Sequence, residues 1–167
     1  MNYFDLFEIP LQLKVDKATL PHKYFELSRK YHPDYFSNAS PEEQAVALDM
    51  SAMLNKAFRV FQNPDETIKY VLQLKRLLEE EEKYELQPGF LMEVLEINEA
   101  IMDADDPETR EKVKSAITEL QNEIYEPVQE IVEHYKEGVT TEKELLQVKE
   151  YYYKKKYIDR IREQLGS

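Results

Sequence analysis

Apolar side chains recur along this chain at the three- and four-residue spacing of an α-helix, and no useful stretch alternates apolar and polar residues as a strand would. A capping side chain followed by proline marks three helix starts, and a threonine–glutamate capping box marks a fourth. These signals are Ser40-Pro41, Asn63-Pro64, Asp106-Pro107 and Thr141 with Glu144. We therefore predict an all-α fold. The predicted helices cover residues 3–8, 17–31, 41–61, 64–76, 88–103, 107–137 and 141–165.

The lengths of these helices predict two domains. Residues 1–76 form a helical hairpin with short flanking helices, and residues 88–167 form an antiparallel three-helix bundle. Residues 77–87 contain four consecutive glutamates, and we interpret them as an acidic linker or helix extension. Pro127 falls inside the second helix of the bundle, but the apolar spacing continues across it. We therefore expect a kink there rather than a break.

Composition narrows the classes of function. The chain of 167 residues has no cysteine, which excludes disulfides, cysteine nucleophiles and thiolate ligation of a metal or cluster. Its histidines, His22, His32 and His134, lack the spacing of metal ligands, so we predict no metal site and no cofactor. Neither a membrane-spanning apolar run nor a signal peptide is present. We expect a cytoplasmic protein that does not bind a membrane.

Charge is distributed unevenly. The net charge is −12; residues 1–76 carry ten basic and ten acidic side chains, whereas residues 77–167 carry twelve and twenty-four. Between Lys83 and Arg110 lie eight acidic residues and no basic one. Such a field repels nucleic acid and attracts a basic protein surface. The lysines and tyrosines of residues 151–157 are therefore interpreted as a solvated helix face with core and interface tyrosines, not as a nucleic-acid site.

A loop follows the second predicted helix and reads Tyr31-His32-Pro33-Asp34. Pro33 ends the helix and biases His32 away from helical geometry, which leaves the Asp34 carboxylate available on a turn. Leu20, Tyr24, Leu27 and Tyr31 form the apolar stripe of that helix, and the opposite arc holds His22, Lys23, Arg29 and Lys30 with Glu26. By themselves these features also fit a solvated helix and an ordinary turn. An acid/base pair of His32 and Asp34 is a poor enzyme site, because no nucleophile, metal ligand or phosphate-binding glycine accompanies it.

The N-terminal domain resembles a J-domain over about 75 residues. The resemblance is carried, in order, by residues 2–9, the stripe ending in Tyr31, the His32-Pro33-Asp34 loop and residues 55–58. In that family the loop and the basic face of the second helix dock on a DnaK-type chaperone and stimulate its ATPase. The resemblance implies this role for His32, Pro33, Asp34, Lys23, Arg29 and Lys30. Tyr35 departs from the basic residue that commonly follows the motif.

The first helix of the bundle has an unusual outer face. Phe90, Val94, Ile97 and Ile101 form its core stripe, whereas Leu91, Met92 and Leu95 turn towards Glu96, Glu99 and Asp103. This half-apolar, half-acidic face suits a basic, partly hydrophobic partner. The alternative is that Leu91 and Leu95 pack under the third helix and the acids are simply solvated.

Residues 90–96 and the two-domain order resemble the HscB family of J-proteins, whose members deliver the iron–sulfur scaffold protein to its dedicated chaperone. The resemblance implies a co-chaperone, not an enzyme, with a DnaK/HscA-type ATPase and an IscU-type scaffold as partners. It places the scaffold on Leu91, Met92, Leu95, Glu96, Glu99, Asp103 and, on the last helix, Tyr157. The metal-binding cysteine extension of some eukaryotic members is absent, and we expect a bacterial protein. Two alternatives remain: a J-domain protein with a different client, and a helical scaffold protein whose His-Pro-Asp loop is incidental.

Overall fold

The computed structural model describes residues 1–166; Ser167, the last residue of the predicted bundle, lies outside them. Within residues 1–166 the regular structure is helical throughout, as the sequence predicts. The chain separates into two compact units, Met1–Val71 and the residues from Leu72 onward. The division falls within a helix, ahead of the predicted border at residue 76. No helix among the described residues has the length and apolarity needed to cross a bilayer.

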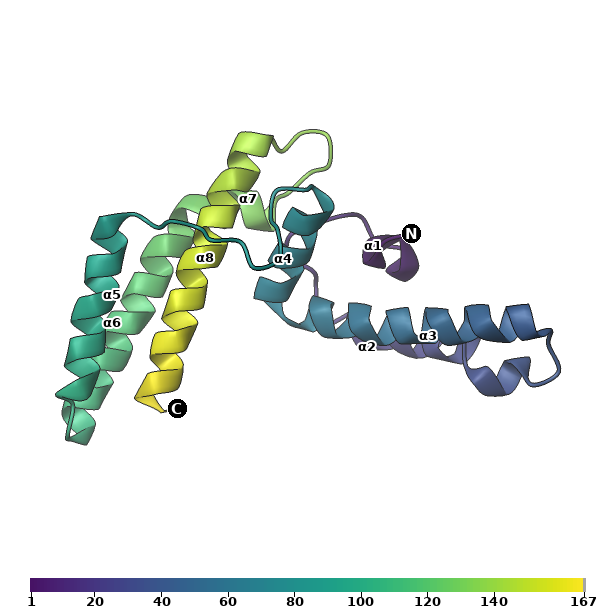
Figure 1. The fold of residues 1–167 in the computed structure, drawn as a ribbon, viewed down its shortest axis with the longest axis horizontal. Coiled ribbons are helices and arrows are strands. Elements are labelled where there is room, and N and C mark those ends of the chain that lie inside the picture. Colours follow the sequence, from purple (N-terminus) through teal and green to yellow (C-terminus); the bar gives the residue numbers. More distant parts are fainter. Residues whose placement is uncertain (167) are drawn as a thin grey trace. The chain divides into compact units, whose positions relative to one another are not determined.

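The N-terminal unit is built around a helical hairpin. Helix α2 packs along helix α3, and a short 3₁₀ turn connects them (Figure 1). Helix α1 contacts both, and α4 begins in this unit. The elements are α1 (Tyr3–Phe7), α2 (Leu20–Lys30), the 3₁₀ turn Pro33–Phe36, α3 (Pro41–Gln62) and α4 (Pro64–Leu74). The capping predictions for α3 and α4 are confirmed, since the Ser40 and Asn63 side chains accept hydrogen bonds from the backbone of the following turn.

Aromatic contacts hold the hairpin together. The Tyr24 ring of α2 stacks on Phe58 of α3 with centroids 4.3 Å apart, and its hydroxyl donates to Asn55 Oδ1 at 2.7 Å. Ala57, fully buried on the same helix, lets the two backbones approach closely. One turn further along α3, Phe61 contacts the Phe4 and Phe7 rings of α1 in tilted and edge-on geometry. This packing fixes the rotation of α2 and so decides which of its side chains face outward.

The C-terminal unit is a three-helix bundle in which α6 runs antiparallel to α5 and α8 (Figure 1). Its elements are α5 (Pro88–Met102), α6 (Pro107–Tyr125), the 3₁₀ turn Glu126–Val128, α7 (Gln129–Glu133) and α8 (Glu142–Leu165). The predicted starts of α6 and α8 are confirmed by the Asp106 cap and the Thr141–Glu144 capping box. Helix α8 packs against both α5 and α6, so it supplies much of the core.

The prediction of one kinked helix over residues 107–137 is wrong. Proline 127 has no N–H to donate, and the α-helix stops at Tyr125, passes through a 3₁₀ turn and resumes only as far as Glu133. The 3₁₀ turn also changes which side chains of the following helix face the core. Val132 is buried, whereas Ile131 is only half-buried. Residues 134–141 form the connection to α8, with Gly138 at a φ of +81°.

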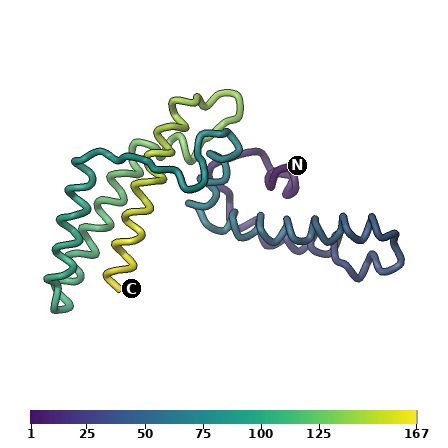
Figure 2. The backbone as a smooth tube through the Cα atoms, viewed as in Figure 1, coloured from purple at the N-terminus to yellow at the C-terminus, as the bar shows by residue number. Residues whose placement is uncertain are grey.

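Residues 77–87 are not helical and run in an extended path to α5 (Figure 2). We call residues 77–87 the strap. Leu78 and Leu86 are buried, and Tyr84 stacks on Tyr153 of α8 with centroids 4.6 Å apart. Glu82 forms an ion pair with Lys149 at 2.5 Å. The strap is therefore packed along the bundle in spite of its four consecutive glutamates.

Candidate functional site

The His32-Pro33-Asp34 segment, hereafter the HPD loop, sits directly after α2. That helix ends at Lys30, and His32 adopts an extended conformation with φ −64° and ψ 132°. Pro33 then begins the 3₁₀ turn, which places Asp34 on an outward bend with 89% of its side chain exposed. The predicted geometry of the loop is confirmed. Its carboxylate is open to a partner.

Local hydrogen bonds stiffen the HPD loop. His32 Nδ1 accepts from the Asp34 backbone N–H at 3.2 Å, so the neutral ring carries its hydrogen on Nε2. The loop therefore offers a partner both an anionic acceptor and an N–H donor. No group of three or more acidic, histidine or cysteine residues within residues 1–166 is arranged to hold a metal ion. An open loop of this kind suits recognition better than acid/base chemistry, which requires a positioned reacting group.

The basic arc of α2 divides into two kinds of residue. Lys23 Nζ lies 2.9 Å from Glu8 Oε2 and 3.7 Å from Glu26 Oε1, and its side chain is only 22% exposed. The hydrogen bond to Glu8 is the main reason why the pKa of Lys23 is raised. Arg29, in contrast, is exposed and lines a hollow beside the HPD loop. Lys30 is exposed and lies over the Tyr31 ring at 5.3 Å. Helical spacing places Lys23 with Arg29 and Lys30, but Lys23 is already paired with Glu8, the residue that caps the end of α1.

Two exposed aromatic residues beside the HPD loop have no role in the sequence-based prediction. Phe25 and Tyr35 are 64% and 72% exposed and border a hollow of about 390 Å³. The Tyr35 ring meets His32 edge-on at 6.3 Å. Phe25 could have been found from the sequence, since it is an aromatic residue on the charged side of an amphipathic helix. Both add apolar contact area next to Asp34.

The second candidate surface is the α5 outer face, which we define as Leu91, Met92, Leu95, Glu96, Glu99 and Asp103. Leu91, Met92 and Leu95 are 38%, 56% and 49% exposed, whereas Phe90 and Val94 on the other side of the helix are buried. Burial of Leu91 and Leu95 under α8 is therefore not what the structure shows. Their exposure leaves an apolar strip next to three acids.

Tyr157 of α8 reaches α5 through Phe90. The two rings meet edge-on with centroids 6.3 Å apart, and the Arg160 guanidinium lies 5.4 Å from the Tyr157 ring centre. Tyr157 is half-buried by these contacts. It thus borders α5 on the side of the core stripe, and part of its ring remains open.

Met102 extends the apolar strip and was missed by the sequence-based prediction. It is 82% exposed, follows Leu95 by seven residues and lies on the same side of the helix as Leu91. The spacing alone could have identified it. With Met102 the strip reaches the C-terminal end of α5.

Comparison with known proteins identifies the family of this chain. The family model described as the HSCB C-terminal oligomerisation domain matches residues 86–166. A co-chaperone protein HscB homolog of Shewanella halifaxensis is 32% identical over 171 residues, which cover 99% of this chain and 95% of that protein. The chain belongs to the HscB family of co-chaperones. A Photobacterium profundum HscB homolog is 35% identical over 113 residues, where the alignment spans 65% of this chain and 66% of the relative, slightly less than two thirds of its length.

Solved HscB structures agree with both units of the fold. The crystal structure of human co-chaperone protein HscB superposes with a TM-score of 0.81 at 28% identity, covering 99% of this chain and 80% of the human chain. Chaperone HscB from Vibrio cholerae gives a TM-score of 0.73 at 25% identity, with 99% and 95% covered. The N-terminal unit is accordingly a J-domain, and the C-terminal unit is the helical bundle of the HscB family. These relatives are named as chaperones or co-chaperones rather than enzymes.

Proposed function

We propose that this HscB-family protein binds an IscU-type iron–sulfur cluster scaffold, delivers it to a DnaK/HscA-type chaperone and stimulates the ATPase of that chaperone. The HPD loop with Arg29 and Lys30 contacts the chaperone. Lys23 contributes indirectly, because its ion pair with Glu8 holds α2 in position. The α5 outer face with Tyr157 contacts the scaffold. The protein itself carries no catalytic group in this scheme, and it acts in the bacterial cytoplasm without nucleic acid or membrane as a partner.

One observation carries the proposal: each compact unit exposes its own preformed surface, and the two surfaces differ in chemistry. The J-domain presents a carboxylate on a stiff turn beside exposed cations. The bundle presents exposed leucine and methionine side chains beside acids. A protein that brings a client to a chaperone requires two such independent surfaces.

The acids of α5 lie where they do not help the helix. Glu99 belongs to the last turn and Asp103 is the C-terminal cap residue, and the last turn contains no basic residue. Negative charge at a helix C-terminus opposes the helix dipole. Residues that lower the stability of their own helix are common at functional surfaces, and here their charge suits a basic partner.

The proposal is tested with three purified components. ATP hydrolysis by the DnaK/HscA-type chaperone is measured with and without this protein, and binding of the IscU-type scaffold is measured by calorimetry. We expect stimulated hydrolysis, a saturable complex with the scaffold, and further stimulation when both are present. Stimulation without scaffold binding would favour a J-domain protein with another client. Absence of both would favour a helical scaffold protein with an incidental HPD loop.

A further inference from the structure

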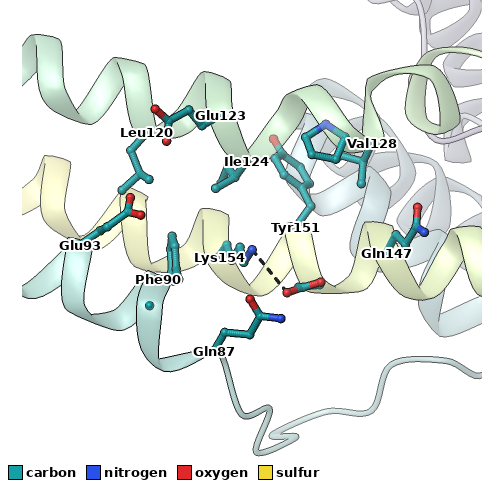
Figure 3. Close-up of a pocket in the computed structure, with 13 residues that line it drawn as sticks. Gln87, Phe90, Glu93, Leu120, Glu123, Ile124, Val128, Gln147, Tyr151 and Lys154 are labelled. Carbon is teal, nitrogen blue, oxygen red and sulfur yellow. Dashed lines mark ion pairs between the residues drawn. The ribbon is translucent and has the colours of Figure 1, made fainter.

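A groove of about 750 Å³ lies between α5, α6 and α8 (Figure 3). None of the residues that line it belongs to the α5 outer face. The floor of the groove consists of the apolar side chains of Phe90, Leu120, Ile124, Val128 and Tyr151. All five are at least nine-tenths buried, so the groove floor is formed by the edge of the bundle core. The 3₁₀ turn at Pro127 borders the groove where α6 is interrupted.

Acidic residues from all three helices surround this floor. Glu93 of α5 and Glu123 of α6 reach the groove from its two sides, and Glu150 belongs to α8 (Figure 3). The one lysine of the groove, Lys154, pairs with Glu150 at 3.4 Å. Neither Glu93 nor Glu123 has an ion-pair partner among residues 1–166. The groove therefore carries an uncompensated negative charge above an apolar floor.

Lys154 shows which chemistry the groove favours. Its ammonium group is 5.4 Å from the centre of the Phe90 ring while it pairs with Glu150. A cation is thus held between an aromatic face and a carboxylate. The other two carboxylates of the groove, Glu93 and Glu123, have no such cation among the described residues.

We infer that this groove binds a lysine or arginine side chain from a basic segment of a partner protein. The stem of that side chain lies on Ile124 and Leu120, and its charged end lies between Glu93 and Glu123. A second copy of this chain fits poorly, because residues 77–167 carry twice as many acidic as basic side chains and would repel each other. The inference does not depend on scaffold binding at the α5 outer face.

The test uses the full chain and a peptide probe, acetyl-Leu-Lys-Leu-amide, followed by NMR titration of backbone amides. We expect saturable shifts that centre on Phe90, Glu93, Glu123 and Tyr151. A peptide with glutamine in place of lysine should bind at least fivefold more weakly, and one with glutamate should not bind. Equal binding of the lysine and glutamine peptides would overturn the inference.

Matched double variants separate the groove from general acidity. Glu93→Gln with Glu123→Gln should weaken the lysine peptide at least fivefold, since it removes both unpartnered carboxylates. Glu108→Gln with Glu163→Gln changes the net charge equally, outside both the groove and the α5 outer face, and should leave the affinity within twofold. All four glutamates are exposed, so melting curves should confirm that both variants fold. An equal loss in both variants would show non-specific attraction and overturn the site. Shifts at the groove that grow with protein concentration alone would assign it to a second copy instead.

Discussion

The Asp34 carboxylate is held on a turn whose geometry depends on its backbone rather than on its charge. The side chain is 89% exposed, and the hydrogen bond that stiffens the HPD loop uses the Asp34 N–H. We predict that Asp34→Asn reduces stimulation of the chaperone ATPase to background while the melting temperature stays unchanged. Steady-state ATP hydrolysis and circular dichroism melts provide the two measurements.

Asp49→Asn is the control for this prediction. Asp49 is also an exposed aspartate of the J-domain, on α3, and its neutralisation changes the net charge equally. This variant should stimulate normally. Normal stimulation by a folded Asp34→Asn protein would remove the HPD loop from the proposed mechanism.

Arg29 and Lys23 are predicted to behave differently although both lie on α2. Arg29→Glu should lower stimulation about tenfold at low salt, and the difference should shrink once the Debye length falls below about 10 Å, because an exposed docking charge is screened. Lys23→Glu should lower the melting temperature, because it faces Glu8 with a second carboxylate. Adding Glu8→Lys should restore the melt. If the two single variants lose stimulation equally with equal stability, the distinction is wrong.

At the scale of single elements, helix α5 packs into the core with one side and exposes apolar residues on the other. Its core side is buried through Phe90 and Val94, whereas Leu91, Met92 and Leu95 are exposed. We predict that changing these three residues to alanine weakens scaffold binding by about 3 kcal/mol, mainly through faster dissociation, and hardly alters the melt. Surface plasmon resonance and thermal melts distinguish the effects.

A structural role for the same side chains makes the opposite forecast. Buried leucines changed to alanine would each cost about 2–5 kcal/mol of folding stability. A large drop in melting temperature with unchanged binding per folded molecule would therefore exclude the interface. Alanine at Glu96, Glu99 and Asp103 serves as the companion variant, since loss of charge should slow association instead.

The ion pair between Glu82 of the strap and Lys149 of α8 should make the stability of the C-terminal unit depend on pH. Partial burial would raise the pKa of Glu82, but hydrogen bonds from Lys149 and the Glu79 N–H, together with the Lys149 charge, hold it below its ordinary value of 4.5. A carboxyl whose pKa is lower in the folded state stabilises the fold above pH 4.5, and this stabilisation is lost as pH falls through the folded pKa. We predict that Glu82→Gln flattens the loss of stability that follows as pH falls below 4.5.

Urea unfolding at a series of pH values measures this effect. Glu81→Gln is the control, because Glu81 stands next to Glu82 but is exposed and has no ion-pair partner among the described residues. It should follow the wild-type pH profile. Parallel profiles for Glu82→Gln and the wild type would mean that the pair with Lys149 does not contribute to stability.

At the scale of the whole molecule, the two surfaces belong to separately compact units. Each should therefore work when the other is disabled. We predict that Asp34→Asn binds the scaffold with wild-type affinity, and that the triple alanine variant of α5 stimulates the chaperone normally when no scaffold is present. The assay of each variant on both functions checks this independence.

A mixture of the two variants tests whether one molecule must carry both surfaces. A mixture of Asp34→Asn protein and triple alanine protein contains both working surfaces, but on different molecules. It should not reproduce the extra stimulation that the wild type gives with scaffold, because delivery requires one chain to hold both partners. Full complementation by the mixture would contradict the delivery model.

Local chemistry explains what could be predicted from the sequence alone. Helix starts depend on a capping side chain with either a proline directly after it or a glutamate three residues later, so Ser40, Asn63, Asp106 and Thr141 were located correctly. The HPD loop depends only on Pro33 and its neighbour, and the exposed strip of α5 depends on helical spacing. Each of these features involves residues within about one or two helical turns of each other.

Tertiary packing decided the features that join distant residues. The capture of Lys23 by Glu8 and the packing of the strap on Lys149 and Tyr153 bring together residues from different elements. The groove exists only because three helices place its floor and its acids around one space. Periodicity specifies which side of a helix is apolar, but not which charged residue meets it from elsewhere, since that depends on how the helices pack. The sequence determined the helices and the exposed loop, and packing determined which charges remain available to a partner.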